Sequence, residues 1–216
     1  LAELLRSSAF HEIIVVDGGS EDATCSIVSQ FVDKSADLDK SDIRLLASSC
    51  GRARQMNMGA SQARSDVLLF LHADTRLPPG TVERVQTAIN SGYLWGRFDV
   101  RLDDDHILFR IVERLMNVRS ALSGIATGDQ AIFVRRDVFE MLGGYAPIAL
   151  MEDIELCKRL KWVGPPARIQ DKVTTSTRRW RHFGITRTVV LMWWLRLLYW
   201  FGVSPDRLVC FYKNSR

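Results

Sequence analysis

The first half of the chain alternates short apolar runs with amphipathic segments. The apolar runs at residues 12–17, 43–47 and 67–71 have the length and composition of strands. Helical patterns follow these runs, from a cap at Ser20 or Asp22 to Val32, from Arg52 to Ala63 and from Thr81 to Asn90. Three successive strand–helix units predict an α/β fold with a mainly parallel sheet and helices on both faces.

The run Val67–Leu71 is the most uniform of the three. Its five consecutive apolar residues predict a central strand that is buried on both faces. Pro78, Pro79 and Gly80 then force a turn. Asp74 therefore follows a buried strand, at the sheet edge where open α/β folds bind their ligands.

The second half has a mixed pattern. Strands are expected at residues 94–102 and 131–134, and helices at residues 107–118, 136–142 and 152–163, the last of which ends at Gly164-Pro165-Pro166. An apolar run over residues 189–203 is too short, at about 15 residues, to span a bilayer, which takes about 20. It predicts either a helix in the core or a homodimer seam, or an interfacial membrane helix with tryptophans at its rim.

Composition narrows the class of protein. The 216 residues are 47% hydrophobic, which excludes a disordered chain, and the net charge is +4. The basic residues are not interleaved with aromatic residues, so no nucleic-acid partner is expected. The four cysteines are scattered, which argues against a zinc site or a disulfide framework and favours a reducing, cytoplasmic location.

Several acidic residues are candidates for chemistry. Asp17, before Gly18 and Gly19, either accepts a hydrogen bond from a ribose or base or closes an Asx turn. Asp74 either caps a turn or ligates a hard divalent cation, and His72 is expected to be its packing or hydrogen-bonding neighbour rather than a ligand.

Two later segments add polar groups. Glu152 and Asp153 begin a predicted helix, where the helix dipole stabilises carboxylates and favours the ionised form that a base requires. Gly128, Asp129 and Gln130 form a polar cluster before a strand.

Taken in order, five segments resemble the family-2 glycosyltransferases of GT-A fold. They are residues 12–24 (EIIVVDGGSEDAT), 51–59 (GRARQMNMG), 70–75 (FLHADT), 128–134 (GDQAIFV) and 151–156 (MEDIEL). Within the family, GRARQ and LHADT are similar to a small bacterial subgroup labelled arsenosugar- or selenium-associated glycosyltransferases. The resemblance implies a GT-A domain over residues 1–186, a helical appendage over 187–216, and a location in the cytoplasm or at the inner face of the membrane.

The resemblance also implies roles for individual residues. The chain would be an inverting enzyme of hexosyltransferase type that uses a nucleotide-sugar donor, most simply a UDP-sugar, with Mg²⁺ or Mn²⁺. Asp153 matches the catalytic base of a Glu-Asp pair with Glu152, and Asp74 matches the metal ligand. The donor side matches Asp17, Gly18, Gly19, Arg52, Gln55 and Asn57, and the acceptor side matches Gly128, Asp129 and Gln130.

The sequence departs from the family pattern in two places. His72 stands where the metal motif usually has a carboxylate, and nothing before Glu12 resembles the opening strand and its Pro-x-x-Asn-Glu loop. The second departure leads to the alternative of a non-catalytic binding or assembly protein on a truncated scaffold. A dehalogenase-like phosphatase is a weaker alternative, because position 19 is glycine where that chemistry needs a second aspartate.

Overall fold

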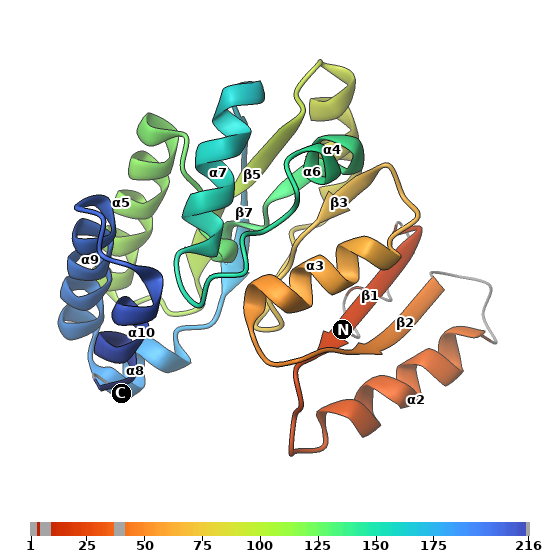
Figure 1. Ribbon diagram of the computed structural model, residues 1–216, viewed down its shortest axis with the longest axis horizontal. Helices are drawn as coiled ribbons and strands as arrows, with labels where there is room; N and C mark the ends of the chain where they lie inside the picture. Colours follow the sequence, from red (N-terminus) through yellow and green to blue (C-terminus); the bar gives the residue numbers. More distant parts are fainter. Residues whose placement is uncertain (1–3, 5–9, 37–41, 215–216) are drawn as a thin grey trace.

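The strands form two sheets (Figure 1). The computed structural model describes residues 4, 10–36 and 42–214. The strands are β1 (Glu12–Asp17), β2 (Asp42–Ala47), β3 (Val67–Leu69), β4 (Thr75–Arg76), β5 (Trp95–Leu102), β6 (Phe133–Arg135) and β7 (Ala167–Thr175). The helices are α2 (Thr24–Ala36), α3 (Arg52–Gln62), α4 (Thr81–Asn90), α5 (Ile107–Ser123), the 3₁₀ turn η1 (Gly128–Gln130), α6 (Arg136–Met141), α7 (Glu152–Val163), α8 (Arg178–Phe183), α9 (Ile185–Trp200) and α10 (Pro205–Asn214).

The smaller sheet pairs β1 with β2 in parallel, and the larger sheet has the order β3-β6-β5-β7-β4. In the larger sheet β5 and β7 are parallel, whereas the β3–β6, β5–β6 and β4–β7 pairs are antiparallel. The predicted α/β class, with helices on both faces, is confirmed. The larger sheet is mixed, because β6 is antiparallel to both of its neighbours and β4 is antiparallel to β7.

The prediction of a central strand over Val67–Leu71 is wrong. β3 covers only Val67–Leu69 and lies at the edge of its sheet, next to β6. The apolar run continues because Phe70 leaves the strand and packs in an aromatic cluster, with ring centroids 5.1 Å from Phe139 and 5.0 Å from Tyr145. Packing against α6 and the loop after it therefore supplies the burial that the pattern attributed to neighbouring strands.

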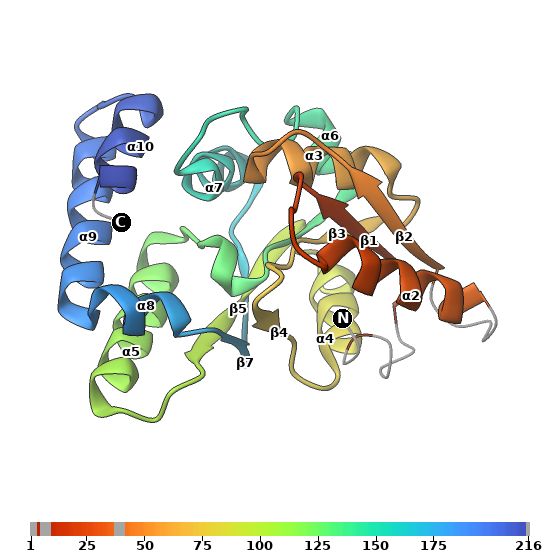
Figure 2. The ribbon, with the colours of Figure 1, turned by 90° about the horizontal axis from the view of Figure 1, so that it is seen from below.

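The core lies on both faces of the larger sheet. Phe133 packs on the side of α4 with Val85, whereas Val134, the next residue of β6, packs on the side of α3, α6 and α7. This alternation is expected of a strand that is covered on both faces. Figure 2 shows α4 and α3 on either side of the sheet.

The C-terminal helices share a core with the start of α7. Leu195 of α9 and Leu208 of α10 are fully buried against Leu150, Met151 and Ile154. The division of the chain at residue 186 stays a prediction from the sequence. Within the described residues, no helix combines the length and the apolar character needed to cross a bilayer.

Candidate active site

The N-terminal ends of α3 and α7 meet in a charged contact. Met151 precedes α7 in a left-handed conformation, with φ of 68°, and this sharp turn places Glu152 and Asp153 in the first turn of the helix. The Nε of Arg52, the first residue of α3, lies 2.9 Å from Oε1 of Glu152. The structure therefore brings together one donor-side residue and one residue of the acidic pair.

Glu152 is buried, with 2% of its surface exposed. Burial raises the pKa of its carboxyl group, while the positive charge of Arg52 opposes that increase. Its Oε2 atom is buried without a hydrogen-bond partner. Within the described part of the chain, Glu152 forms an ion pair with Arg52 alone. This ion pair fixes the position of the half-exposed Arg52 side chain.

Asp153 is only partly buried and faces the loop of η1. Its Oδ2 accepts a hydrogen bond of 2.9 Å from the backbone N–H of Gly128, and its Oδ1 accepts one of 2.7 Å from the N–H of Ile154. The carboxylate therefore has a fixed orientation. The predicted base and the predicted acceptor-side loop lie in direct contact.

His72 and Asp129 form a second ionic contact beside this loop. His72 Nδ1 lies 3.3 Å from Asp129 Oδ1, so the partner of His72 is in the η1 loop, whereas the sequence pattern placed His72 beside Asp74. Burial lowers the pKa of His72, but the hydrogen bond and the charge of Asp129 outweigh it, and the pKa lies above its ordinary value. Burial likewise raises the pKa of Asp129, but His72 outweighs it and the pKa lies below its ordinary value.

Gly128 is required by the close approach of His72. A Cβ atom at this position would lie 2.3 Å from His72 Nε2. Gln130, by contrast, is fully buried and holds the loop from inside. Its side chain accepts from the N–H of Thr127 at 3.2 Å and donates to the carbonyl oxygen of Phe98 at 3.3 Å, so it shapes the site without facing a ligand.

Asp17 caps its own loop. Its carboxylate accepts hydrogen bonds from the N–H groups of Gly19 and Ser20 at 2.8 and 3.0 Å, and from the Ser20 hydroxyl at 2.5 Å. These hydrogen bonds, that of the Ser20 hydroxyl first, lower the pKa of Asp17 to about 2. These hydrogen bonds close the Asx-type turn, and the contact of Asp17 with a ribose or base stays a prediction.

Two other donor-side residues make structural contacts. Gln55 donates to the carbonyl oxygen of Val16 at 3.1 Å, and it packs so closely on Gly18 that a Cβ there would lie 2.8 Å from its Nε2. Asn57 is paired with the backbone of Tyr145, to whose oxygen it donates at 2.8 Å and from whose N–H it accepts at 2.9 Å. Gln55 therefore supports the glycine loop, whereas Asn57 ties α3 to the loop after α6.

Asp74 is exposed at the end of the turn after β3. Within the described residues its carboxylate forms no side-chain hydrogen bond or ion pair, and no three histidine, cysteine or acidic side chains gather as a ready metal site. Mg²⁺ and Mn²⁺ favour oxygen ligands, and Mg²⁺ is commonly held by one or two carboxylates together with substrate phosphates. A single free carboxylate fits that mode of binding.

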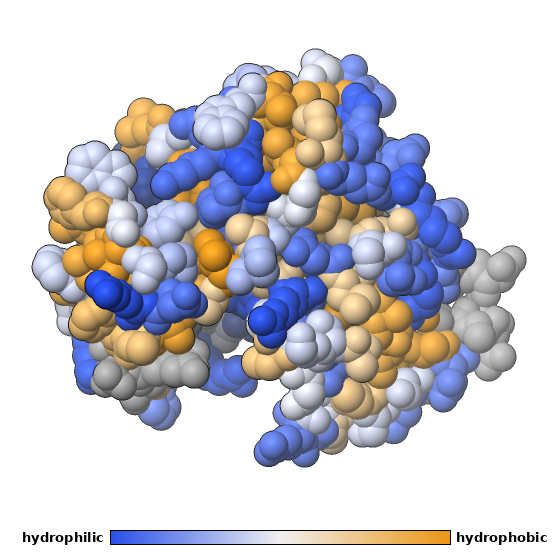
Figure 3. Space-filling model, in the orientation of Figure 1, coloured by the Kyte–Doolittle hydropathy of each residue, from blue (hydrophilic) through white to orange (hydrophobic). Residues whose placement is uncertain are grey.

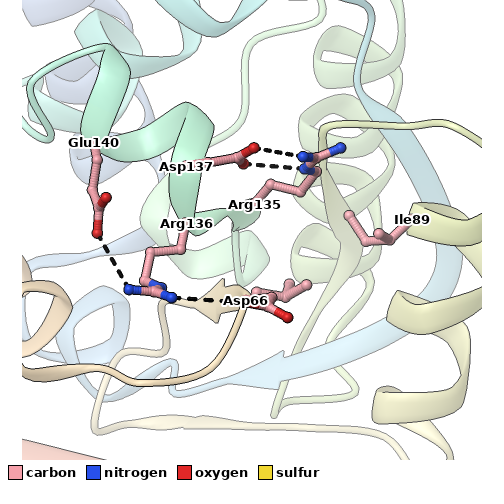
Figure 4. Close-up of a pocket in the computed structure, with 7 residues that line it drawn as sticks. Asp66, Ile89, Arg135, Arg136, Asp137 and Glu140 are labelled. Atoms are coloured by element: carbon pink, nitrogen blue, oxygen red, sulfur yellow. Dashed lines mark hydrogen bonds and ion pairs between the residues drawn. The ribbon is translucent and has the colours of Figure 1, made fainter.

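A groove of about 370 Å³ lies elsewhere, at the amino end of β3 (Figure 4). Its arginines are already paired, Arg135 with Asp137, and Arg136 with Asp66 and Glu140. With its charges neutralised from within, this groove offers a ligand no free ionic group.

The candidate site thus contains a positioned carboxylate, Asp153, near the cationic side chain of Arg52 and the imidazole of His72, whose pKa lies above its ordinary value. Such a set is suited to accepting a proton while negative charge is stabilised close by. Sequence reasoning did not find the Arg52–Glu152 contact. It also missed Arg119 of α5 and Arg196 of α9. The sequence hints at Arg196 alone, because this residue interrupts an apolar run.

The comparisons with known proteins agree with this fold. The family described as Glycosyl transferase family 2 matches residues 1–142. Among solved structures, the chain is similar to residues 1–349 of TarS from S. aureus, with TM-score 0.60, 15% identity, and coverage of 87% of this chain and 59% of that one. It is also similar to the mannosyltransferase PcManGT from Pyrobaculum calidifontis in complex with GDP-Man and Mn²⁺.

For PcManGT the TM-score is 0.62 and the identity 17%, with coverage of 90% of this chain and 56% of that one. The chain thus spans less than two thirds of the length of either structure. No curated protein sequence matches it. At these identities the solved structures establish the shared GT-A fold.

Proposed function

Because the chain belongs to glycosyl transferase family 2, we propose that it transfers a sugar from a nucleotide-sugar donor to a hydroxyl group of an acceptor, with inversion at the anomeric carbon. The observation that supports this most directly is the contact of Asp153 with the η1 loop, next to Glu152 and its ion-pair partner Arg52. It places a proton acceptor where positively charged groups are also available.

In the proposed reaction Asp153 takes the proton of the acceptor hydroxyl. The acceptor oxygen forms a bond to the anomeric carbon as the bond from that carbon to the donor phosphate breaks, and the nucleoside diphosphate leaves with the electron pair. The N–H of Gly128 holds the carboxylate in one orientation for this step. Glu152 is proposed to be a positioning residue, since its ion pair within the described residues is with Arg52.

The leaving diphosphate needs positive charge. Arg52 is half-exposed, and only its Nε is engaged by Glu152, so its other nitrogen atoms are available to donate to phosphate oxygens. Asp74 would hold Mg²⁺ or Mn²⁺ together with those oxygens, and the cation would supply further stabilisation of the departing charge. The Mn²⁺ in the PcManGT complex supports this part of the proposal.

The donor is proposed to carry UDP, bound beside the Asp17 loop. PcManGT was solved with GDP-Man, so both nucleotides belong in the test. Purified protein is incubated with UDP-sugars and GDP-sugars in the presence of Mn²⁺, and nucleotide release is measured. Folded protein that neither binds nor consumes any of these donors at millimolar concentration would contradict the proposal.

A second candidate function is a binding or assembly protein without catalysis. It is favoured by the internal engagement of Asp17, Gln55 and Asn57, whose polar atoms are used by the protein's own backbone. Calorimetry of donor binding, read together with the nucleotide-release assay, separates the two candidates. A binding protein would bind the donor without releasing nucleotide.

We propose that the exposed apolar face of α9 contacts an anionic membrane surface. Trp193 and Trp194 are about half exposed, and Trp200 is 74% exposed. Figure 3 shows apolar surface over α5 and α9 at the left of the molecule. Arginines outnumber the single aspartate over residues 178–207, and this charge favours anionic lipid.

The test is sedimentation with vesicles of phosphatidylcholine and phosphatidylglycerol. Trp194→Ser and Trp200→Ser should weaken vesicle binding, whereas Trp162→Ser, at an 84% exposed position on α7, should not. Dimers that dissociate in the same two variants, without vesicle binding, would overturn the proposal in favour of a homodimer seam.

A further inference from the structure

Two arginines of the C-terminal half lie on α5 and α9, two helices that pack against each other. Arg119 belongs to α5 and Arg196 to α9. The Nε and Nη2 atoms of Arg119 and the Nε atom of Arg196 are buried and have no hydrogen-bond partner. Within the described residues, neither guanidinium takes part in an ion pair, although sixteen other contacts of that kind are formed.

This arrangement is unfavourable unless something is bound. Nitrogen atoms that lose their water without gaining a hydrogen-bond partner destabilise a folded protein, and two like charges near each other add to that effect. Burial and the positive charge of Arg196 lower the pKa of Arg119 to about 10, so the two guanidiniums are close enough to repel each other. Both remain charged at neutral pH.

The nearest negative charges belong to the candidate site. Asp153 favours the protonated form of both arginines, and Asp129 does so for Arg196. The pair therefore lies close to the predicted base and to the η1 loop. Asp153 and Asp129 are held by Gly128 and His72, so neither closes an ion pair with the arginines.

The position of the pair separates it from the donor side. In Figures 1 and 2, α5 and α9 lie on one side of α7, whereas α3 and the β1 loop lie on the other. Arg52, at the start of α3, is the residue that the proposed function assigns to the donor diphosphate. An anion bound by Arg119 and Arg196 would therefore reach Asp153 from the opposite side to the donor diphosphate.

We propose that Arg119 and Arg196 form an anion-binding subsite that selects an acceptor carrying a phosphate monoester. Two guanidiniums match the charge of a phosphate dianion, and each presents N–H donors suited to phosphate oxygens. A single carboxylate would leave one of the two charges uncompensated. This inference rests on the proposed function, because only a glycosyl transfer has an acceptor. The anion site itself does not require turnover.

The test measures binding of a defined probe. Glycerol 1-phosphate is titrated into the full chain by calorimetry, with and without UDP, and glucuronate serves as the carboxylate probe. Arg119→Gln and Arg196→Gln should each weaken phosphate binding by about tenfold or more. Arg114→Gln, at an exposed position on the same helix, should leave it unchanged.

Thermal unfolding separates a binding role from a structural one. Removing an unpaired buried charge should raise the Tm of the ligand-free protein by about 2–4 °C in either glutamine variant. A lower Tm, or phosphate binding equal to that of the unmodified protein, would overturn the proposal. Phosphate binding without any nucleotide release would leave the anion site standing and contradict only the proposed function.

Vesicles distinguish the source of the phosphate. Equimolar phosphatidylcholine and phosphatidic acid present a monoester on a lipid, whereas phosphatidylcholine and phosphatidylglycerol present a diester. Competition between glycerol 1-phosphate and the phosphatidic acid vesicles, lost in Arg196→Gln, assigns the site to lipid phosphates. Binding of glycerol 1-phosphate without such competition assigns it to soluble acceptors, and binding of neither probe would overturn the proposal.

Discussion

Arg52 Nε lies 2.9 Å from Glu152 Oε1, and this contact joins the first residues of two helices that are a hundred positions apart in the chain. Glu152 is buried, whereas Arg52 is half-exposed. The buried carboxylate is thus compensated by a side chain that can also reach a ligand. We therefore expect donor binding and stability to depend on the same contact.

Replacement of Arg52 by glutamine should leave Glu152 buried without its countercharge. We expect a loss of about 1–2 kcal/mol in the free energy of unfolding, less than for a fully buried pair because Arg52 is partly solvated. Chemical denaturation measures this loss. The double variant R52Q/E152Q should recover most of it, and a double variant no more stable than R52Q would show that the contact is not the cause.

The Asp17 loop predicts a pH dependence. Since the pKa of Asp17 in the folded chain is about 2, below its ordinary value, the loop is stabilised above the unfolded pKa and loses this stabilisation as the pH falls through 2. Ser20→Ala should move the pKa back toward its ordinary value. An NMR titration of the Asp17 carboxyl carbon measures it, and an unchanged pKa in S20A would contradict the hydrogen-bonding cause.

Asn57 offers a test of structure against ligand binding. Asn57→Ala removes both hydrogen bonds to the Tyr145 backbone, so the free energy of unfolding should fall by about 1–3 kcal/mol. The Kd of the donor for the folded protein should change by less than about twofold. Ser61→Ala on the exposed face of α3 is the control. A large fall in donor affinity of Asn57→Ala without loss of stability would indicate that Asn57 contacts the donor.

Asp74 tests the role of the cation. Asp74→Asn should raise the Mn²⁺ concentration needed for half-maximal nucleotide release by about tenfold or more, because one charged ligand is lost. Its exposed side chain forms no hydrogen bond or ion pair within the described residues, so the Tm should not change. An unaltered Mn²⁺ dependence would remove Asp74 from the metal site.

The sequence predicted the local elements better than their pairing. The helices over Thr81–Asn90 and Glu152–Val163 begin and end at the predicted residues, because caps, prolines and glycines mark their ends locally. The edge position of the strand within Val67–Leu71 could not be predicted. Apolar residues are buried equally well by aromatic side chains of a helix or by neighbouring strands. β7 was missed since its alternation of arginine, glutamine and lysine resembles a solvated segment.

The candidate site shows the same limit. Asp153, Gly128 and Asp129 were predicted from their motifs, and the structure brings them together. Arg119 and Arg196 could not be predicted, because arginines on amphipathic helices usually face solvent and only the packing of α5 against α9 buries them. Gln130 resembled a ligand-facing residue, but it is fully buried by contacts that are remote in sequence.

The most direct test of the proposed mechanism is nucleotide release by Asp153→Asn. With UDP-sugar or GDP-sugar donors and Mn²⁺, kcat should fall by about 10²–10⁴-fold while the Kd of the donor stays within about twofold, since only the proton acceptor is lost. Asp137→Asn, in the groove at the amino end of β3, should retain full activity. Nucleotide release by Asp153→Asn at the unmodified rate would contradict the account.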